Sequence, residues 1–270
     1  MGEIGKAIVF GIVQGFTEWL PISSTGHMIL LEEFLAFSFD KAFTDTFFVV
    51  TQLGSILAVV ILYFRRLWPF GGGKSRREKA DIWGLWLRTL TAVIPAGVVG
   101  VLFEDWIDRY LFNSRVVAAA LIFYGVLFLI LERRPRRAKI RSLRELSYPA
   151  ALLIGVFQVL ALVPGTSRSG ATILGGVFLG CARPVAAEFS FFLAIPVMAG
   201  ASGLKLLKAG FAFSAAEWLT LAVGCLAAFL VSAAAIKLLL AYIRRHNFRV
   251  FGYYRIILGL AVLVYFISIS

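Results

Sequence analysis

The chain has 270 residues, of which 60% are hydrophobic, and long apolar runs recur along it. This composition excludes a soluble globular domain and indicates an integral membrane protein. The formal net charge is +12. Because the basic residues are gathered in three loops and are not interleaved with exposed aromatic residues, we expect no nucleic-acid partner.

The apolar stretches in chain order predict an all-α polytopic membrane protein. A helical span needs roughly 20 mostly apolar residues. Six stretches meet this requirement, near residues 44–64, 88–103, 115–131, 186–204, 217–241 and 252–268. Two more, 4–36 and 149–183, are interrupted by a proline and a Ser/Thr/Gly cluster. These two cannot be read as plain spans.

Lysine and arginine in short loops mark the cytoplasmic side of a membrane protein. Three basic clusters are present. They comprise Arg65, Arg66, Lys74, Arg76, Arg77, Lys79 and Arg88, then the basic residues of 133–144, then Lys237, Arg244, Arg245 and Arg249. All three are predicted to be cytoplasmic.

Counting crossings between these loops decides what the interrupted stretches do. With all three basic clusters inside, segment 149–183 must begin and end inside, so it dips into the membrane and returns. The same parity makes 4–36 enter from outside. Each re-entrant helical hairpin is followed by three transmembrane helices, so halves 1–132 and 146–270 form an inverted-topology repeat, with the charged linker 132–147 and its Pro135 between them. A site is expected near the midplane.

The two hairpins also share sequence. With one gap before Pro21 and a compensating gap near Thr25, the alignment pairs Ser24 with Ser167. It likewise pairs Gly11, Gln14, Pro21, Gly26, Ile29 and Leu30 with Gly155, Gln158, Pro164, Gly170, Ile173 and Leu174. The repeated pattern indicates a duplicated broken-helix element.

Irregular backbone inside a bilayer is tolerated only where protein or water satisfies it, so both turns must line a shielded cavity. In each hairpin the second arm begins after the turn. Its candidate N-caps are Ser23, Ser24 or Thr25, and Thr166, Ser167 or Ser169. The free N–H groups and helix dipole there favour an anion. Gly165 and Gly170 would let the backbone approach that ligand.

Four side chains in these turns can carry chemistry. The fork of Arg168 fits phosphate oxygens. Glu18 is a costly ionisable group at membrane depth, on one helical face with Gln14. Ser24 and His27 share a face, so nucleophile, acid/base and carboxylate could act together. Two plainer interpretations stay open: Glu18 and Arg168 form only a structural ion pair, or the serines only cap and His27 is a core residue.

At this point the motifs identify a family. The motifs are Gln14-x-x-x-Glu18, Pro21-x-Ser-Ser-Thr-Gly-His27, Pro164-Gly-Thr-Ser-Arg-Ser-x-x-Thr172, Gln52-Leu-Gly-Ser-Ile-Leu-Ala-Val59 and Glu188-Phe-Ser-Phe191. Together they resemble bacterial undecaprenyl-diphosphate phosphatases of the BacA type, over nearly the whole chain. The resemblance implies conversion of an isoprenoid diphosphate lipid to its monophosphate, recycling of the cell-wall lipid carrier, and bacitracin resistance. It also implies a site open to the periplasmic face and a divalent cation, Mg²⁺ or Ca²⁺, with Glu18 as a candidate ligand.

These roles predict a mechanism. Arg168 and the amides after Pro164 hold the phosphates, Ser24 attacks the terminal phosphorus, Glu18 acts as base or metal ligand, and His27 assists as acid/base. Further substrate contacts are assigned to Gln14, Ser23, Thr25, Ser167, Ser169, Gly170 and Thr172. Attack by His27 or by water, and a lipid-phosphate transporter or flippase, are the alternatives. The glycine-rich span 97–100 permits the close helix packing of a homodimer.

Overall fold

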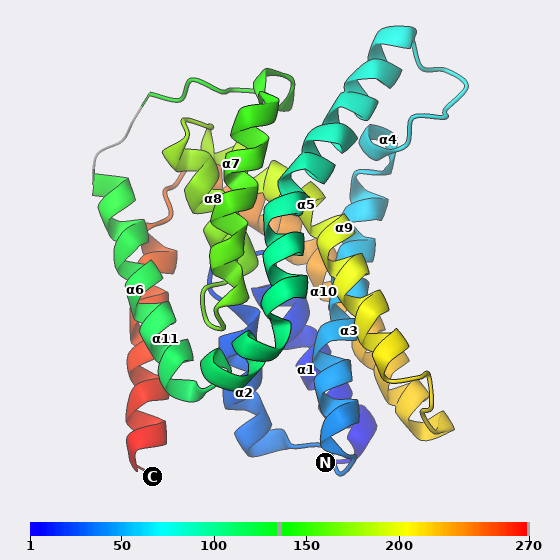
Figure 1. The fold of residues 1–270 in the computed structure, drawn as a ribbon, viewed down its shortest axis with the longest axis vertical. Coiled ribbons are helices and arrows are strands. Elements are labelled where there is room, and N and C mark those ends of the chain that lie inside the picture. Colours follow the sequence, from blue (N-terminus) through cyan, green and yellow to red (C-terminus); the bar gives the residue numbers. More distant parts are fainter. Residues whose placement is uncertain (134–136, 269–270) are drawn as a thin grey trace.

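The computed structural model describes residues 1–133 and 137–268, apart from the side chains of Glu104 and Asp108. Within these residues, six helices are long and apolar enough to cross a membrane. They are α3 (Lys41–Leu62), α5 (Arg76–Leu111), α6 (Ser114–Arg133), α9 (Arg183–Lys208), α10 (Ala215–Ile243) and α11 (Arg249–Ser268) (Figure 1). The predicted all-helical fold and its six spans are confirmed.

The two interrupted stretches form pairs of short helices. The first pair is α1 (Glu3–Thr17) and α2 (Ser24–Leu35); the second is α7 (Tyr148–Val159), extended by the 3₁₀ turn η2 (Leu160–Leu162), and α8 (Arg168–Phe178). At 1.5 Å per residue, a helix of 11 to 15 residues extends only about 16 to 22 Å, less than a bilayer core of about 30 Å. The first arm of each pair ends a few residues before the proline that the sequence singled out, at Thr17 before Pro21 and at Leu162 before Pro164.

The second span begins much earlier than predicted. Helix α5 starts at Arg76, so the basic residues from 76 to 88, expected in a loop, lie on its first turns. A capping box fixes this start: the Ser75 hydroxyl accepts from the Glu78 amide, and the Glu78 carboxylate accepts from the Ser75 amide. Hydropathy identifies only the apolar part of such a helix, so it did not predict the charged first turns. Residues 134–136, which include Pro135 of the predicted linker, lie outside the described residues.

The short helices are each held against a long one. Helix α1 packs along α10, and α7 packs along α5, while α6 and α11 form a separate pair at one side (Figure 1). Glycines permit both close approaches. A Cβ on Gly11 would lie 2.5 Å from the Gly224 carbonyl oxygen, and one on Gly155 would lie 2.3 Å from that of Ala92. Larger residues there would force the helices apart.

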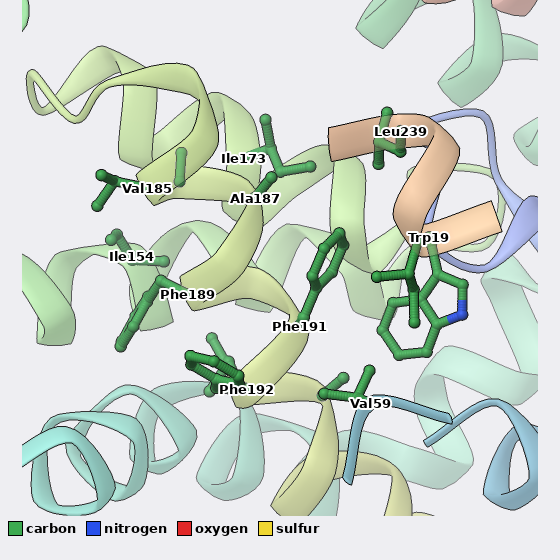
Figure 2. Packing of buried hydrophobic residues seen from close by; sticks show 14 of the residues in the cluster. Trp19, Val59, Ile154, Ile173, Val185, Ala187, Phe189, Phe191, Phe192 and Leu239 are labelled. Atoms are coloured by element: carbon green, nitrogen blue, oxygen red, sulfur yellow. The ribbon is translucent and has the colours of Figure 1, made fainter. Parts of the chain in front are cut away.

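The main core joins the first turn to the second half of the chain. Trp19 is fully buried and meets Phe191 of α9 edge to face, with ring centroids 5.2 Å apart (Figure 2). Two short elements remain: helix α4 (Phe64–Leu67) and the 3₁₀ turn η1 (Leu143–Glu145). Both cysteines, Cys181 and Cys225, are free, and burial raises the pKa of the Cys181 thiol to about 11.

Candidate active site

The second arm of each broken helix begins with a serine in an unusual backbone conformation. Ser23 has φ 71° and its Oγ accepts from the Gly26 amide at 3.3 Å; Ser167 has φ 72° and accepts from the Gly170 amide at 3.1 Å. Positive φ is uncommon outside glycine and costs energy, so it marks a site under constraint. Of the candidate caps, the structure selects these two.

This geometry corrects the alignment of the two turns. Ser23, and not Ser24, has the same local structure as Ser167, and the next residues in line are Ser24 and Arg168, the first helical residues of α2 and α8. The alignment was wrong by one residue because the second turn has one more residue between its proline and its cap. The chemically different residues Ser24 and Arg168 therefore occupy equivalent places.

Glu18 contacts both of these equivalent residues, Ser24 and Arg168. Its buried carboxylate accepts from the Ser24 hydroxyl at 3.0 Å and from the Gln14 amide at 2.9 Å through Oε2. Through Oε1 it accepts from Arg168 at 3.2 Å. Four of the predicted site residues thus meet at one carboxylate, although Arg168 lies 150 positions from Glu18 in the sequence. A carboxylate in contact with a hydroxyl and a guanidinium is one arrangement that can support phosphoryl transfer to a serine.

A second set of contacts fixes the Arg168 guanidinium. Its Nη1 donates to the Ser190 carbonyl oxygen at 2.7 Å, and the group lies over the Trp19 ring with Cζ 5.7 Å from the centroid. Thr172 donates to the Ser190 hydroxyl at 2.7 Å. Sequence reasoning missed Ser190, which stands in the Glu188-Phe-Ser-Phe191 motif as a polar residue among aromatic ones. That interruption was the available signal.

His27 belongs to a different network from the carboxylate. Its Nδ1 lies 2.7 Å from the Ser23 carbonyl oxygen, and its Nε2 lies 2.7 Å from the hydroxyl of Tyr254, whose ring is stacked on the imidazole with centroids 5.6 Å apart. A carbonyl only accepts, so Nδ1 carries the proton, and in the neutral ring Nε2 accepts from Tyr254. The expected direct grouping of His27 with Glu18 and Ser24 is replaced by this pair.

Arg255 ties the two turns together. It is fully buried, and its guanidinium donates to the Pro21 carbonyl at 3.1 Å and to those of Gly165 and Thr166 at 2.8 Å each. These are carbonyls that broken helices leave without intrahelical partners. The sequence analysis did not single out this residue. Its signal was a lone arginine within an apolar span, which membrane energetics marks as functional.

The remaining predicted substrate contacts divide in two. Thr25 is half-buried at the start of α2, and it does not cap this helix because Ser23 does. Ser169 instead donates to the backbone oxygens of Glu18 and Leu20, at 3.0 and 3.1 Å. The Gly170 amide is taken by its cap, and a Cβ there would lie 3.0 Å from Arg255, so its small size serves protein packing. Thr172 donates to Ser190. Ser169, Gly170 and Thr172 thus all contact other protein groups that form the site.

The described residues hold no cluster of His, Cys, Asp or Glu side chains that could by itself bind a metal ion. No group of three or more His, Cys, Asp or Glu side chains comes together among them. Glu18 is the carboxylate at the centre, and both of its oxygens already accept hydrogen bonds. Divalent cations of the Mg²⁺ and Ca²⁺ kind need six or more oxygen ligands, so most would have to come from elsewhere.

Comparison with known proteins agrees with these motifs. Residues 7–261 match the family model of the bacitracin resistance protein BacA. The chain is 59% identical to undecaprenyl-diphosphatase 1 of Clostridioides difficile (strain 630), over 98% of this chain and 96% of that protein. It is 56% identical to the undecaprenyl-diphosphatase of Acetivibrio thermocellus over the full length of both, and 52% identical to that of Enterococcus faecalis over 97% and 96%. With its six apolar helices, the chain is a multi-pass membrane protein of the BacA family.

Proposed function

We propose that this protein is an undecaprenyl-diphosphate phosphatase, which releases phosphate from the lipid diphosphate and regenerates the carrier monophosphate. Relatives of that name cover the whole chain. The observation that carries the proposal is the Glu18 carboxylate, which contacts a nucleophilic hydroxyl, Ser24, and a phosphate-binding guanidinium, Arg168. Ser24 and Arg168 are each the first residue of a helix, and the N-terminal amides of a helix are not taken up by intrahelical bonds.

In the proposed reaction, the terminal phosphate displaces Glu18 from Arg168, which binds it together with the first amides of α8. The Ser24 oxygen then attacks the terminal phosphorus while its proton passes to Glu18. The bond from phosphorus to the bridging oxygen breaks, the lipid leaves as the monophosphate, and phosphoserine forms. Water hydrolyses the phosphoserine and restores Ser24. Arg168 stabilises the charge on the transferring group in both steps.

His27 assists from the neighbouring position on the same helix. In the neutral ring, Nε2 carries the lone pair that accepts from the Tyr254 hydroxyl. Once that hydrogen bond breaks, Nε2 can exchange a proton with the leaving oxygen or the incoming water. The same nitrogen could attack phosphorus directly. Trapping with ³²P-labelled substrate separates the two: label on Ser24 is expected, whereas label on His27 that persists in Ser24→Ala would overturn the serine mechanism.

A divalent cation, Mg²⁺ or Ca²⁺, is proposed to arrive with the diphosphate, since the protein offers one carboxylate near the reacting group. Substrate oxygens and water would supply the other ligands, with Glu18 as the one protein ligand. Equilibrium dialysis of substrate-free protein should then show no stoichiometric Mg²⁺ or Ca²⁺, and tight binding without substrate would refute this.

The finer topology is also part of the proposal. We infer two re-entrant hairpins, 4–36 and 149–183, within inverted repeats of residues 1–132 and 146–270. Matching helix partners support this: α1 lies on α10 as α7 lies on α5, and α3 meets α10 as α9 meets α5. The basic segments would face the cytoplasm and the site the periplasm of the bacterial inner membrane. The accessibility of introduced cysteines from each side of the membrane tests the orientation. The homodimer stays a prediction.

The function itself is tested with purified protein in liposomes. Release of phosphate from undecaprenyl diphosphate, lost in Arg168→Gln, is the expected result. If folded protein releases no phosphate with Mg²⁺ or Ca²⁺ present but moves lipid between leaflets, the enzyme assignment fails and the same anion site serves a flippase.

A further inference from the structure

A second cluster of cations lies far from the active site, at the end of the molecule where α5 begins and α4 lies beside it (Figure 1). It surrounds a cavity of about 220 Å³. The lining cations come from four separate segments: Arg65 and Arg66 of α4, Lys74 of the following loop, Arg88 of α5 and Arg144 of η1. Apolar residues form its floor, namely Ile82, Leu85 and Leu143.

Two of the four arginines that line the cavity have no acidic partner among the described residues. Arg144 pairs with Asp81 at 2.8 Å, and Arg66 pairs with Glu188 at 3.0 Å. Arg65 and Arg88 make no ion pair in the described part of the chain. Arg88 lies over the Tyr148 ring, and its Nε is buried without a hydrogen-bond partner there. A buried donor left unpaired is costly, which is a reason to expect an anion beside it.

The remaining carboxylate and ammonium groups are already committed to the backbone. Glu78 caps the start of α5 through Ser75, and Lys74 donates to the Trp68 carbonyl oxygen at 2.6 Å. Lys74 thereby closes the loop that forms one wall. The cavity thus has a fixed shape and a surplus of positive charge. Arginine-lined cavities of this kind bind phosphate groups.

The surroundings indicate that the phosphate is carried by a lipid. Exposed aromatic rings stand at the rim, where Phe70 contacts both Trp68 and Trp83 edge to face. Tryptophan is typical of the headgroup level of a bilayer. From Trp83 an exposed apolar stripe continues along α5 through Leu87, Leu90 and Ile94, at helical spacing and next to the Arg88 face. Acyl chains could follow this stripe while their headgroup reaches the cations.

We propose that this cavity binds the phosphate of an anionic phospholipid headgroup, with Arg65 and Arg88 as its ligands. The site is separate from the one proposed for catalysis. Because it stands among the basic residues that mark the cytoplasmic side, it would hold a lipid of the inner leaflet.

Native mass spectrometry of the purified full chain tests this with three probes: phosphatidylglycerol, phosphatidylcholine and inorganic phosphate. The matched variants are Arg65→Gln/Arg88→Gln and Arg76→Gln/Arg77→Gln. Both remove two positive charges, but Arg76 and Arg77 are exposed and do not line the cavity. In 0.15 M salt, charges more than about 8 Å away are largely screened.

The first variant should retain phosphatidylglycerol about tenfold more weakly than the unaltered protein, and the second within about threefold. Phosphatidylcholine should bind weakly to all three, and inorganic phosphate should not compete. Equal losses in both variants would overturn the site, and competition by inorganic phosphate would overturn the lipid assignment. If the Arg88 substitution prevents folding, as judged by Tm, Arg65→Gln alone must still weaken phosphatidylglycerol selectively.

Discussion

Arg168 donates to the carboxylate of Glu18 across 150 positions of the chain, so the two broken helices meet through one ion pair. In the resting site this pair neutralises both groups. A phosphate that takes over Arg168 leaves Glu18 free to accept the Ser24 proton, so substrate binding itself prepares the base. The ion pair is therefore both structural and catalytic in the mechanism proposed here.

Arg168→Lys should lower kcat by about 100- to 1,000-fold, because an ammonium lacks the planar fork with which the guanidinium can hold the phosphate and the Ser190 carbonyl together. The measurement is phosphate release at saturating substrate by reconstituted protein. KM should change much less than kcat if the contact strengthens in the transition state. A lysine variant with nearly normal kcat would show that only the charge matters.

Glu18→Gln tests the base while keeping the shape of the side chain. The expected loss in kcat is about 10²- to 10⁴-fold, since the amide cannot take the Ser24 proton. Gln14→Ala removes a neighbour that only donates to the same carboxylate, at 2.9 Å, and should cost much less. Comparable losses for the two variants would mean that the network acts through structure alone. The Tm of each variant separates this from unfolding.

Tyr254→Phe keeps the ring stacked on His27 and removes only its hydroxyl. One lost hydrogen bond should lower kcat by about 3- to 10-fold. Because that bond favours the neutral imidazole, the pH of half-maximal kcat on the acid side should move upward. Tyr253→Phe, at the exposed neighbouring tyrosine, is the control and should leave the pH profile in place. An unshifted profile in Tyr254→Phe would remove this residue from a positioning role.

Arg255→Gln should destabilise the protein, because the carbonyls of Pro21, Gly165 and Thr166 lose a shared donor. Each buried carbonyl left unpaired costs about 1 to 3 kcal/mol. A lower Tm in detergent is expected, and Arg115→Gln, at an exposed arginine, should leave Tm unchanged. If Tm holds but kcat falls, Arg255 acts on the reaction and not on the architecture of the turns.

Gly155→Ala should force α7 away from α5, because its Cβ would lie 2.3 Å from the Ala92 carbonyl oxygen. Such overpacking typically costs about 1 to 3 kcal/mol. Gly203→Ala is the matched control, since a Cβ there meets nothing within 4 Å. Thermal unfolding of the two variants in the same detergent should differ in Tm. Equal Tm values would show that the helix pair can shift without cost.

The sequence by itself determined the helical class, the six spans, the two broken helices and most of the residues that gather at Glu18. Hydropathy fixes spans because each must match the bilayer, and a proline beside polar residues reports a break wherever it stands. Motif spacing along one chain was enough to single out Glu18, Ser24 and Arg168, which the structure brings into contact.

Only the tertiary structure decided how these residues are connected. The register of the turns, with Ser23 equivalent to Ser167, depends on cap geometry that a one-residue gap conceals in an alignment. The partnership of His27 with Tyr254, and of Arg255 with both turns, joins positions up to 234 apart. Such contacts depend on how α11 packs against the hairpins, and no local periodicity encodes that packing.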